Sequence, residues 1–137
     1  MTAEHIVVRE PVEVMLVRVA DQLSEIQQAW ASFEAAVGLR GRKFYGLVDL
    51  AAQEYLLATV PRDDDPPDAG GLEHFELPGG EYLRTVLTGE PPELYSRIGS
   101  TMQELQSLTT VDKERYLVEY YRRHDEIELW VPVHESA

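Results

Sequence analysis

The order of strand-like and helix-like segments occurs twice along the chain, and this repeat restricts the fold more than any single motif. An interrupted strand over 5–19, a helix over 21–37 and strands over 44–50 and 55–60 form the first unit. A second interrupted strand over 72–88, a helix from 91 and a hairpin over 115–133 follow in the same order. One offset aligns the units without gaps and pairs Pro61 with Pro132, Val60 with Val131, Tyr45 with Tyr116 and Leu47 with Val118.

Each predicted helix carries one apolar stripe. We expect Asp21 to cap the first helix and Gly38 and Gly41 to end it, while Pro91 and Pro92 open the second, where no backbone donor is needed. The stripes are Leu23, Ile26, Trp30, Phe33 and Val37 in the first helix and Leu94, Ile98, Met102 and Leu105 in the second. Spacings of three and four residues place such a stripe on one face, so both helices are expected to pack against a sheet.

The two units are predicted to form one α+β domain over 1–137. Repeat one spans 5–61, repeat two spans 72–133, and the acidic linker 62–71 (RDDDPPDAGG) is expected to be a loop because its prolines, glycines and aspartates oppose regular structure. Each unit is too small to bury its own core, so we expect antiparallel sheets with approximate two-fold symmetry. Helices are expected on one face and a cleft between the halves on the other.

Composition narrows the class of protein. The 137 residues are 44% hydrophobic and include no cysteine, so a globular domain without disulfides or thiolate sites is expected. The sequence shows neither a signal peptide nor an apolar run of roughly 20 residues, and a cytoplasmic location follows by default. A formal net charge of −13 disfavours direct nucleic-acid binding and favours a cationic ligand or a basic protein partner, although solubility alone would also explain it.

Several motifs, taken in order, resemble those of one family. In the first half they are 42–46 (RKFYG) and 55–61 (YLLATVP), and in the second half they are 77–82 (LPGGEY) with Gly89, 117–121 (LVEYY) and 127–132 (IELWVP). Together they resemble the GyrI-like, or gyrase-inhibitor-like, small-molecule-binding domain. The same domain forms the effector-binding part of multidrug-responsive bacterial transcription regulators.

The resemblance implies two SH2-like β-α-β-β repeats around a cleft whose aromatic pocket has a glutamate at its base. Glu119 matches that glutamate. Because only four residues precede His5 in this sequence, the chain is expected to be a stand-alone member. Relatives of that kind include gyrase-binding proteins and hydrolases that open strained cyclopropane rings of genotoxic natural products.

Glu119 is the candidate site residue because a carboxylate stands in the most apolar predicted strand. Strand alternation places it on one face with Leu117 and Tyr121. If Trp130 shares that face, the carboxylate lies among aromatic rings. The predicted ligand-binding residues are Glu119, Trp130, Tyr121, Tyr55, Tyr82 and Trp30. The alternatives are a solvated Glu119 paired across strands, a Trp130 packed between strands and a Trp30 buried in the core.

A carboxylate among aromatic rings suits an amphipathic cation. Aromatic faces attract positive charge by about 0.5 to 2 kcal/mol each, and an unpaired buried carboxylate is relieved by a cationic ligand. The same carboxylate, with a raised pKa, could act as a general acid or base if the protein is a hydrolase. A third hypothesis is an inhibitor that binds a basic protein through its acidic surface.

Other chemistry finds little support in the sequence. The four histidines are scattered without ligand spacing, so no metal site is predicted. Neither a Gly-x-Ser-x-Gly elbow nor a glycine-rich phosphate loop occurs, and no cofactor is expected.

Overall fold

The computed structural model describes residues 4–38, 42–63, 65 and 72–134. Within these residues, eight strands form one antiparallel sheet in the order β1-β6-β8-β7-β3-β4-β2-β5. The strands are β1 (His5–Arg9), β2 (Val12–Ala20), β3 (Phe44–Asp49), β4 (Glu54–Thr59), β5 (Glu73–Leu77), β6 (Gly80–Thr88), β7 (Leu117–Arg123) and β8 (Glu126–Pro132). The predicted antiparallel α+β class is confirmed, with all of these strands in a single sheet.

The two interrupted strands pair with each other, antiparallel, on both sides of their breaks. β1 pairs with β6 and β2 pairs with β5, so each long strand contributes to both halves of the sheet. A Cβ on Gly79 would lie 2.4 Å from the Arg9 carbonyl oxygen and 2.8 Å from the Pro11 nitrogen. The break at Pro11 and the break at Gly79 therefore lie against each other, and only a residue without a side chain fits there.

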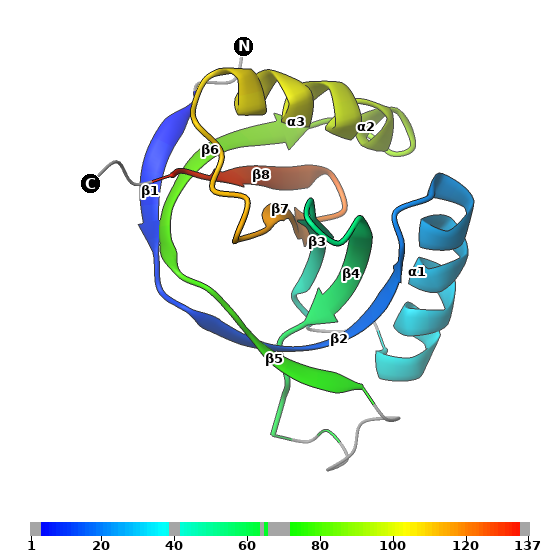
Figure 1. Cartoon of the computed structure of the whole chain (residues 1–137). Helices are drawn as coiled ribbons and strands as arrows, with labels where there is room; N and C mark the ends of the chain where they lie inside the picture. Colours follow the sequence, from blue (N-terminus) through cyan, green and yellow to red (C-terminus); the bar gives the residue numbers. More distant parts are fainter. Residues whose placement is uncertain (1–3, 39–41, 64, 66–71, 135–137) are drawn as a thin grey trace.

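The sheet curls, and this curvature gives it a buried concave face (Figure 1). Val7 of β1 and Phe75 of β5 come from opposite edges of the sheet, yet both pack against the same apolar cluster. That cluster is made of Val14, Leu16, Tyr45, Leu47, Leu56, Ala58, Leu77, Tyr82, Val118 and Trp130. The concave face is consequently a core of its own rather than an open cleft.

The helices cover the outer face. α1 (Leu23–Val37) packs on β2 and β4, whereas α3 (Ile98–Ser107), preceded by the short α2 (Glu93–Ser96), packs on β6 and β8 (Figure 1). One apolar cluster centred on Phe33 lies beneath α1, and another centred on Leu105 lies beneath α3. No helix of the described residues is long and apolar enough to cross a membrane.

Some local predictions about the helices need correction. The residue that caps α1 is Gln22, not Asp21, and it makes no side-chain capping hydrogen bond. α1 ends at Gly38, whose φ of 80° favours glycine, and Gly41 lies outside the described residues. The second helix is divided at Arg97 into α2 and α3. Of the linker 62–71, only residues 62, 63 and 65 are among the described residues.

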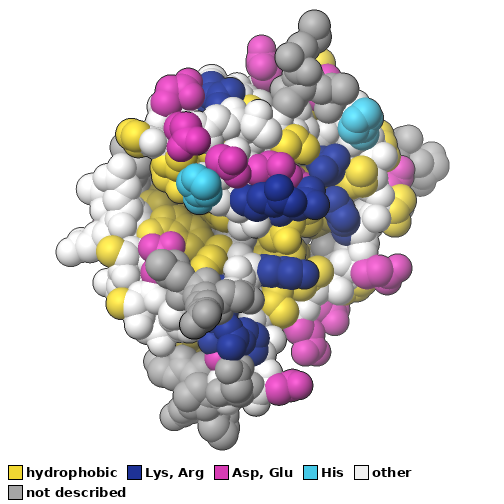
Figure 2. All heavy atoms as spheres, turned by 180° about the vertical axis from the view of Figure 1, so that it is seen from behind, with side chains coloured by type: hydrophobic (Ala, Val, Ile, Leu, Met, Phe, Trp, Pro, Cys, Tyr) yellow, Lys and Arg dark blue, Asp and Glu magenta, His cyan; other side chains and the backbone are white. Residues whose placement is uncertain are grey.

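Charge is unevenly distributed over the surface despite the net charge of −13. On the face opposite to the view of Figure 1, Lys and Arg side chains gather near the centre beside hydrophobic ones, and acidic side chains lie around them (Figure 2). The acidic character of the composition therefore does not describe every part of the molecule.

Candidate functional site

A cleft of about 590 Å³ lies on the outer face, between the two helical segments. Strands β3 and β7, neighbours at the centre of the sheet, supply its floor. Its lining residues are Asp21, Ile26, Gln27, Trp30, Glu34, Phe44, Val48, Tyr55, Tyr95, Ile98, Gly99, Glu119 and Tyr121. The expectation that the cleft lies opposite the helices is wrong: α1 and α3 cover the flanking strands and leave the central pair between them uncovered.

Glu119 lies at the floor of this cleft and is only 9% exposed. Two tyrosine hydroxyls donate hydrogen bonds to its Oε1, from Tyr55 at 2.7 Å and from Tyr121 at 2.6 Å. Tyr121 lies two residues further along β7, on the same face, as strand alternation predicts. Tyr55 comes from β4, on the far side of β3, and reaches Glu119 over Gly46.

Trp30 of α1 lies against the same group of side chains. Its indole Nε1 donates to the Tyr55 hydroxyl oxygen over 3.3 Å. Its ring meets those of Phe44 and Tyr121 edge-on, at centroid distances of 5.9 and 5.4 Å. Tyr95 of α2 faces Tyr121 from the opposite side at 6.4 Å and is 47% exposed. Aromatic rings from both helical segments thus surround the carboxylate.

No cation among the residues that the structure describes balances the charge of Glu119. Among the described residues it has no ion pair, and its second oxygen, Oε2, accepts no hydrogen bond from them. Burial raises the pKa of Glu119, the tyrosine hydrogen bonds lower it in part, and the negative charge of Asp21 raises it further. Burial, together with the nearby Glu119 charge, also raises the pKa values of Tyr55 and Tyr121 well above their ordinary range, so both remain donors.

The structure brings four of the six predicted site residues together and separates the other two. Glu119, Tyr121, Tyr55 and Trp30 line the cleft, whereas Trp130 and Tyr82 pack against each other on the concave face, 5.6 Å apart. Their faces follow from strand register, since Trp130 is opposite Val118 while Glu119 is opposite Leu129. The prediction that Trp130 shares the face of Glu119 is therefore wrong. Trp130 is buried in the core of the concave face and does not line the cleft.

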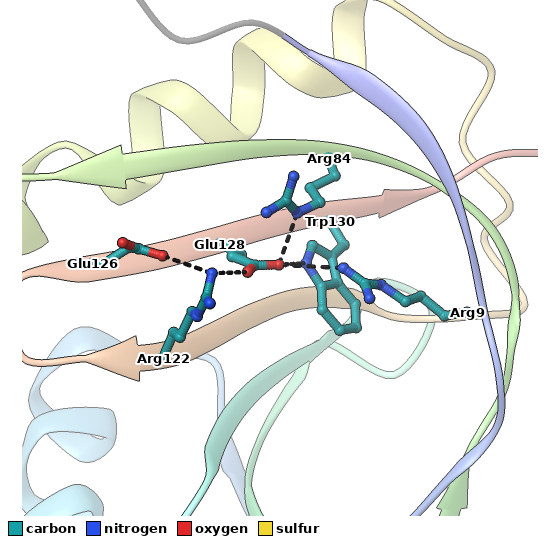
Figure 3. Close-up of polar contacts among 6 residues, drawn as sticks. All are labelled: Arg9, Arg84, Arg122, Glu126, Glu128 and Trp130. Carbon is teal, nitrogen blue, oxygen red and sulfur yellow. Dashed lines mark hydrogen bonds and ion pairs between the residues drawn. The ribbon is translucent and has the colours of Figure 1, made fainter.

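Trp130 belongs to a polar cluster around a different glutamate (Figure 3). Glu128 accepts hydrogen bonds from Arg84 Nε at 2.8 Å and Trp130 Nε1 at 3.0 Å. The guanidinium group of Arg9 lies 4.7 Å from the Trp130 ring centroid and 3.4 Å from Glu128. Burial would raise the pKa of Glu128, but these donors and positive charges lower it overall. Glu128 is thus a compensated carboxylate, unlike Glu119.

Several residues that line the cleft were not among the predicted ones. Glu34 follows Ile26 and Trp30 on the helical stripe, and a glutamate at that spacing could have been recognised as facing the cleft. Asp21, expected as a helix cap, lines the cleft instead. Gly46 left no signal beyond its place in a motif, because its role depends on side chains from two other strands. Within the described residues, no group of His, Asp and Glu side chains is suited to hold a metal ion.

Solved structures share this architecture. An integron cassette protein from the mobile metagenome of Vibrio cholerae superposes with a TM-score of 0.71 at 18% identity, covering 96% of this chain and 95% of that one. SAV2435 bound to tetraphenylphosphonium gives 0.67 at 16% identity over 96% and 94% of the two chains. A hydrolase from Listeria innocua gives 0.58 at 11% identity over 96% and 91%. Likeness at these identities shows the fold alone.

The curled antiparallel sheet with helices on its outer face is consistent with the GyrI-like fold. The sequence matches the family of Cass2, the integron-associated effector-binding proteins, over residues 42–133, and the chain belongs to this GyrI-like family. The resemblance found in the sequence is thereby confirmed. No curated protein matches the sequence. Proteins of the family bind small molecules, which gives the class of function.

Proposed function

We propose that the protein binds hydrophobic, cationic small molecules in the cleft between α1 and α2–α3, with Glu119 as the charge complement. The main support for this proposal is that the Glu119 carboxylate lines the cleft, is 9% exposed and has no ion pair among the described residues. An isolated buried charge is unfavourable by several kcal/mol or takes up a proton. A ligand that brings positive charge to Oε2 removes that penalty.

The walls of the cleft favour the same class of ligand. Trp30, Phe44, Tyr55 and Tyr121 supply aromatic surface around Glu119. A cation over an aromatic face gains about 0.5 to 2 kcal/mol, and apolar groups of the ligand gain roughly 25 cal/mol per Å² buried. The volume of about 590 Å³ lies in the usual range of small-molecule sites. SAV2435, which shares the fold, is bound to a lipophilic cation, tetraphenylphosphonium.

Calorimetric titration with tetraphenylphosphonium and tetraphenylborate tests this proposal, because the two ions have nearly the same shape and opposite charge. At the alkaline end of a pH series, where the largest share of Glu119 is ionised, the cation should bind and the anion should not. Glu119→Gln should lower the affinity for the cation by about tenfold or more, since the substitution removes the charge of the side chain and keeps its shape. Equal binding of both ions, or unchanged binding by the variant, would contradict the role of Glu119.

A matched control removes the same charge elsewhere. Glu25 lies in the first turn of α1 and is not among the residues that line the cleft. Glu25→Gln should leave tetraphenylphosphonium affinity within about twofold, because an exposed charge outside the cleft is screened by salt and solvent. A similar loss in both variants would point to the net charge of the protein and not to Glu119.

Hydrolysis is the second candidate function. The favouring observation is a carboxyl group in the cleft whose pKa burial raises above its ordinary value, because a carboxyl group with a raised pKa is better suited to general acid catalysis. Multiple turnovers on a cyclopropane-containing electrophile, lost in Glu119→Gln while the variant still unfolds cooperatively, would support an enzyme. Binding without product over the same period would leave the protein as a binder.

A further inference from the structure

Within the part of the chain that the structure describes, Glu34 is a second carboxylate of the cleft without a compensating partner. It lies in the last turn of α1 and its side chain lines the cleft. Among the described residues it has no ion pair, and no basic residue occupies the last turn of the helix. A carboxylate at a helix C-terminus meets the negative end of the helix dipole, which is unfavourable. Its partial burial acts in the same direction and raises its pKa.

The position of Glu34 sets it apart from the third acid of the cleft. Asp21 precedes the N-terminus of α1, where the helix dipole favours a negative charge, and it is exposed to solvent. The helix dipole and the solvent therefore stabilise the negative charge of Asp21 without a ligand. Neither of them stabilises the charge of Glu34, which lies at the opposite end of the helix and is partly buried. None of the described residues that line the cleft is Lys, Arg or His, so the cleft itself offers no cation to either Glu34 or Glu119.

Trp30 is related to both uncompensated carboxylates, through Tyr55 to Glu119 and along α1 to Glu34. Glu119 accepts from Tyr55, and Tyr55 accepts from Trp30. Glu34 is one helical turn beyond Trp30, about 6 Å along the axis at 1.5 Å per residue. Trp30 therefore connects the two acids: it donates to the Tyr55 hydroxyl that is bonded to Glu119, and it precedes Glu34 by four residues on the side of α1 that lines the cleft.

We propose that the cleft selects elongated dications, with one positive group at Glu119, an apolar linker across Trp30 and the second positive group at Glu34. This inference rests on the proposed function and specifies its ligand class. Glu34 would then be a specificity residue: it would add little for a compact monocation and a favourable ion pair for a dication of suitable length.

Pairs of ligands that differ in one charge can test the proposal by calorimetry. Hexamethonium and decamethonium carry a trimethylammonium group at each end, whereas hexyltrimethylammonium and decyltrimethylammonium carry only one. For the wild-type protein, at least one dication should bind about three- to fivefold more tightly than its monocation, as expected for a partly exposed ion pair. Because two charges are involved, that advantage should shrink as salt is raised.

Two variants assign the preference to Glu34. Glu34→Gln should remove the advantage of the dication over its matched monocation, and Glu25→Gln on the same helix should retain it. If the monocations bind through Glu119 but the dications gain nothing, or if Glu34→Gln keeps the preference, the inference is overturned and the proposed function stands. If neither monocation nor tetraphenylphosphonium binds, the proposed function itself fails.

Discussion

Tyr55 and Glu119 are joined by a 2.7 Å hydrogen bond that passes over a third strand. Tyr55 belongs to β4 and Glu119 to β7, and β3 lies between them in the sheet. They meet because β3 presents Gly46 at that position, opposite Leu57 on one side and Glu119 on the other. The floor of the cleft therefore depends on a residue that contributes no side chain to it.

Gly46→Ala should damage both the fold and the site. The added Cβ would lie 1.9 Å from the Tyr55 hydroxyl oxygen and 2.7 Å from Glu119 Oε1, so both groups must move. Overpacking of a buried position costs typically about 1–3 kcal/mol, and the displaced hydrogen bond to a carboxylate adds to that loss. Urea unfolding should show the reduced stability, and tetraphenylphosphonium titration should show weaker binding.

The control for this substitution is Gly99→Ala. Gly99 lies in α3, and a Cβ built there meets nothing within 4 Å. Alanine is favoured over glycine in a helix by about 1 kcal/mol, so this variant should be as stable as the wild type or more so. Equal stability of the two alanine variants would show that the space over Gly46 can adapt.

The stability contributed by Glu119 should fall as pH rises. Because burial raises the folded-state pKa above the ordinary value of 4.5, the folded protein binds this proton more tightly than the unfolded chain does. The wild type therefore loses stability as pH rises from 4.5 through the folded pKa, by about 1.4 kcal/mol for each pH unit that separates the two. Glu119→Gln has no such loss, so its free energy of unfolding should increase relative to that of the wild type as pH rises.

Urea unfolding of both proteins across the same pH series measures this difference, since the other titrating groups contribute equally to each. A difference that is constant with pH would mean that the carboxyl titrates alike in the folded and unfolded states. A difference that changes in the opposite direction would mean that the folded protein stabilises the carboxylate, as it does at Glu128.

Tyr121→Phe should move the pH dependence of cation binding upward. The Tyr121 hydroxyl donates to Glu119 Oε1 at 2.6 Å and lowers the pKa of that carboxyl, so its removal raises the pKa further. Since a cation prefers the ionised carboxylate, its affinity should rise with pH, with a midpoint at higher pH in the variant. Tetraphenylphosphonium titrations over a pH series would measure the two midpoints.

Tyr95→Phe serves as the matched control, because Tyr95 contacts the ring of Tyr121 and not Glu119. Its midpoint should coincide with that of the wild type. If Tyr121→Phe also leaves the midpoint in place, the hydroxyl does not govern ionisation of the site.

Local patterns were sufficient to predict much of the fold from the sequence. Periodicity gave α1 and its stripe, and proline and glycine gave both strand breaks. The glutamate itself could also be recognised, because a carboxylate in the strand Leu117–Arg123 conflicts with its apolar neighbours. The approximate two-fold symmetry of the halves stays a prediction.

The relation between the two faces was beyond such patterns. Alternation tells which residues of one strand share a face, but whether Trp130 and Glu119 share a face depends on the register between their two strands. In a flat sheet with one buried side, a tryptophan opposite the helices would indicate a cleft. In a curled sheet both sides are buried, so the same tryptophan is a core residue.

Glu128→Gln should destabilise the protein without affecting cation binding. The folded-state pKa of Glu128 is lowered below its ordinary value of 4.5, so its contribution to stability is present above that pH and is lost as pH falls through the folded pKa. Glutamine keeps the shape but weakens the hydrogen bonds from Arg84 and Trp130, which as charge-assisted bonds contribute about 1.5–3 kcal/mol each. Urea unfolding should therefore show a deficit at pH 7 that narrows in acid, with unchanged tetraphenylphosphonium affinity.

The two tryptophans of the chain report on opposite faces of the sheet, which separates binding in the cleft from binding elsewhere. Trp30 lines the cleft, whereas Trp130 is 4% exposed in the concave core. A ligand beside Glu119 should change the emission of Trp30 only. Quenching by tetraphenylphosphonium should therefore persist in Trp130→Phe and disappear in Trp30→Phe. Calorimetry should still detect binding of tetraphenylphosphonium to Trp30→Phe. Quenching that instead follows Trp130 would place the ligand on the concave face and remove Glu119 from the site.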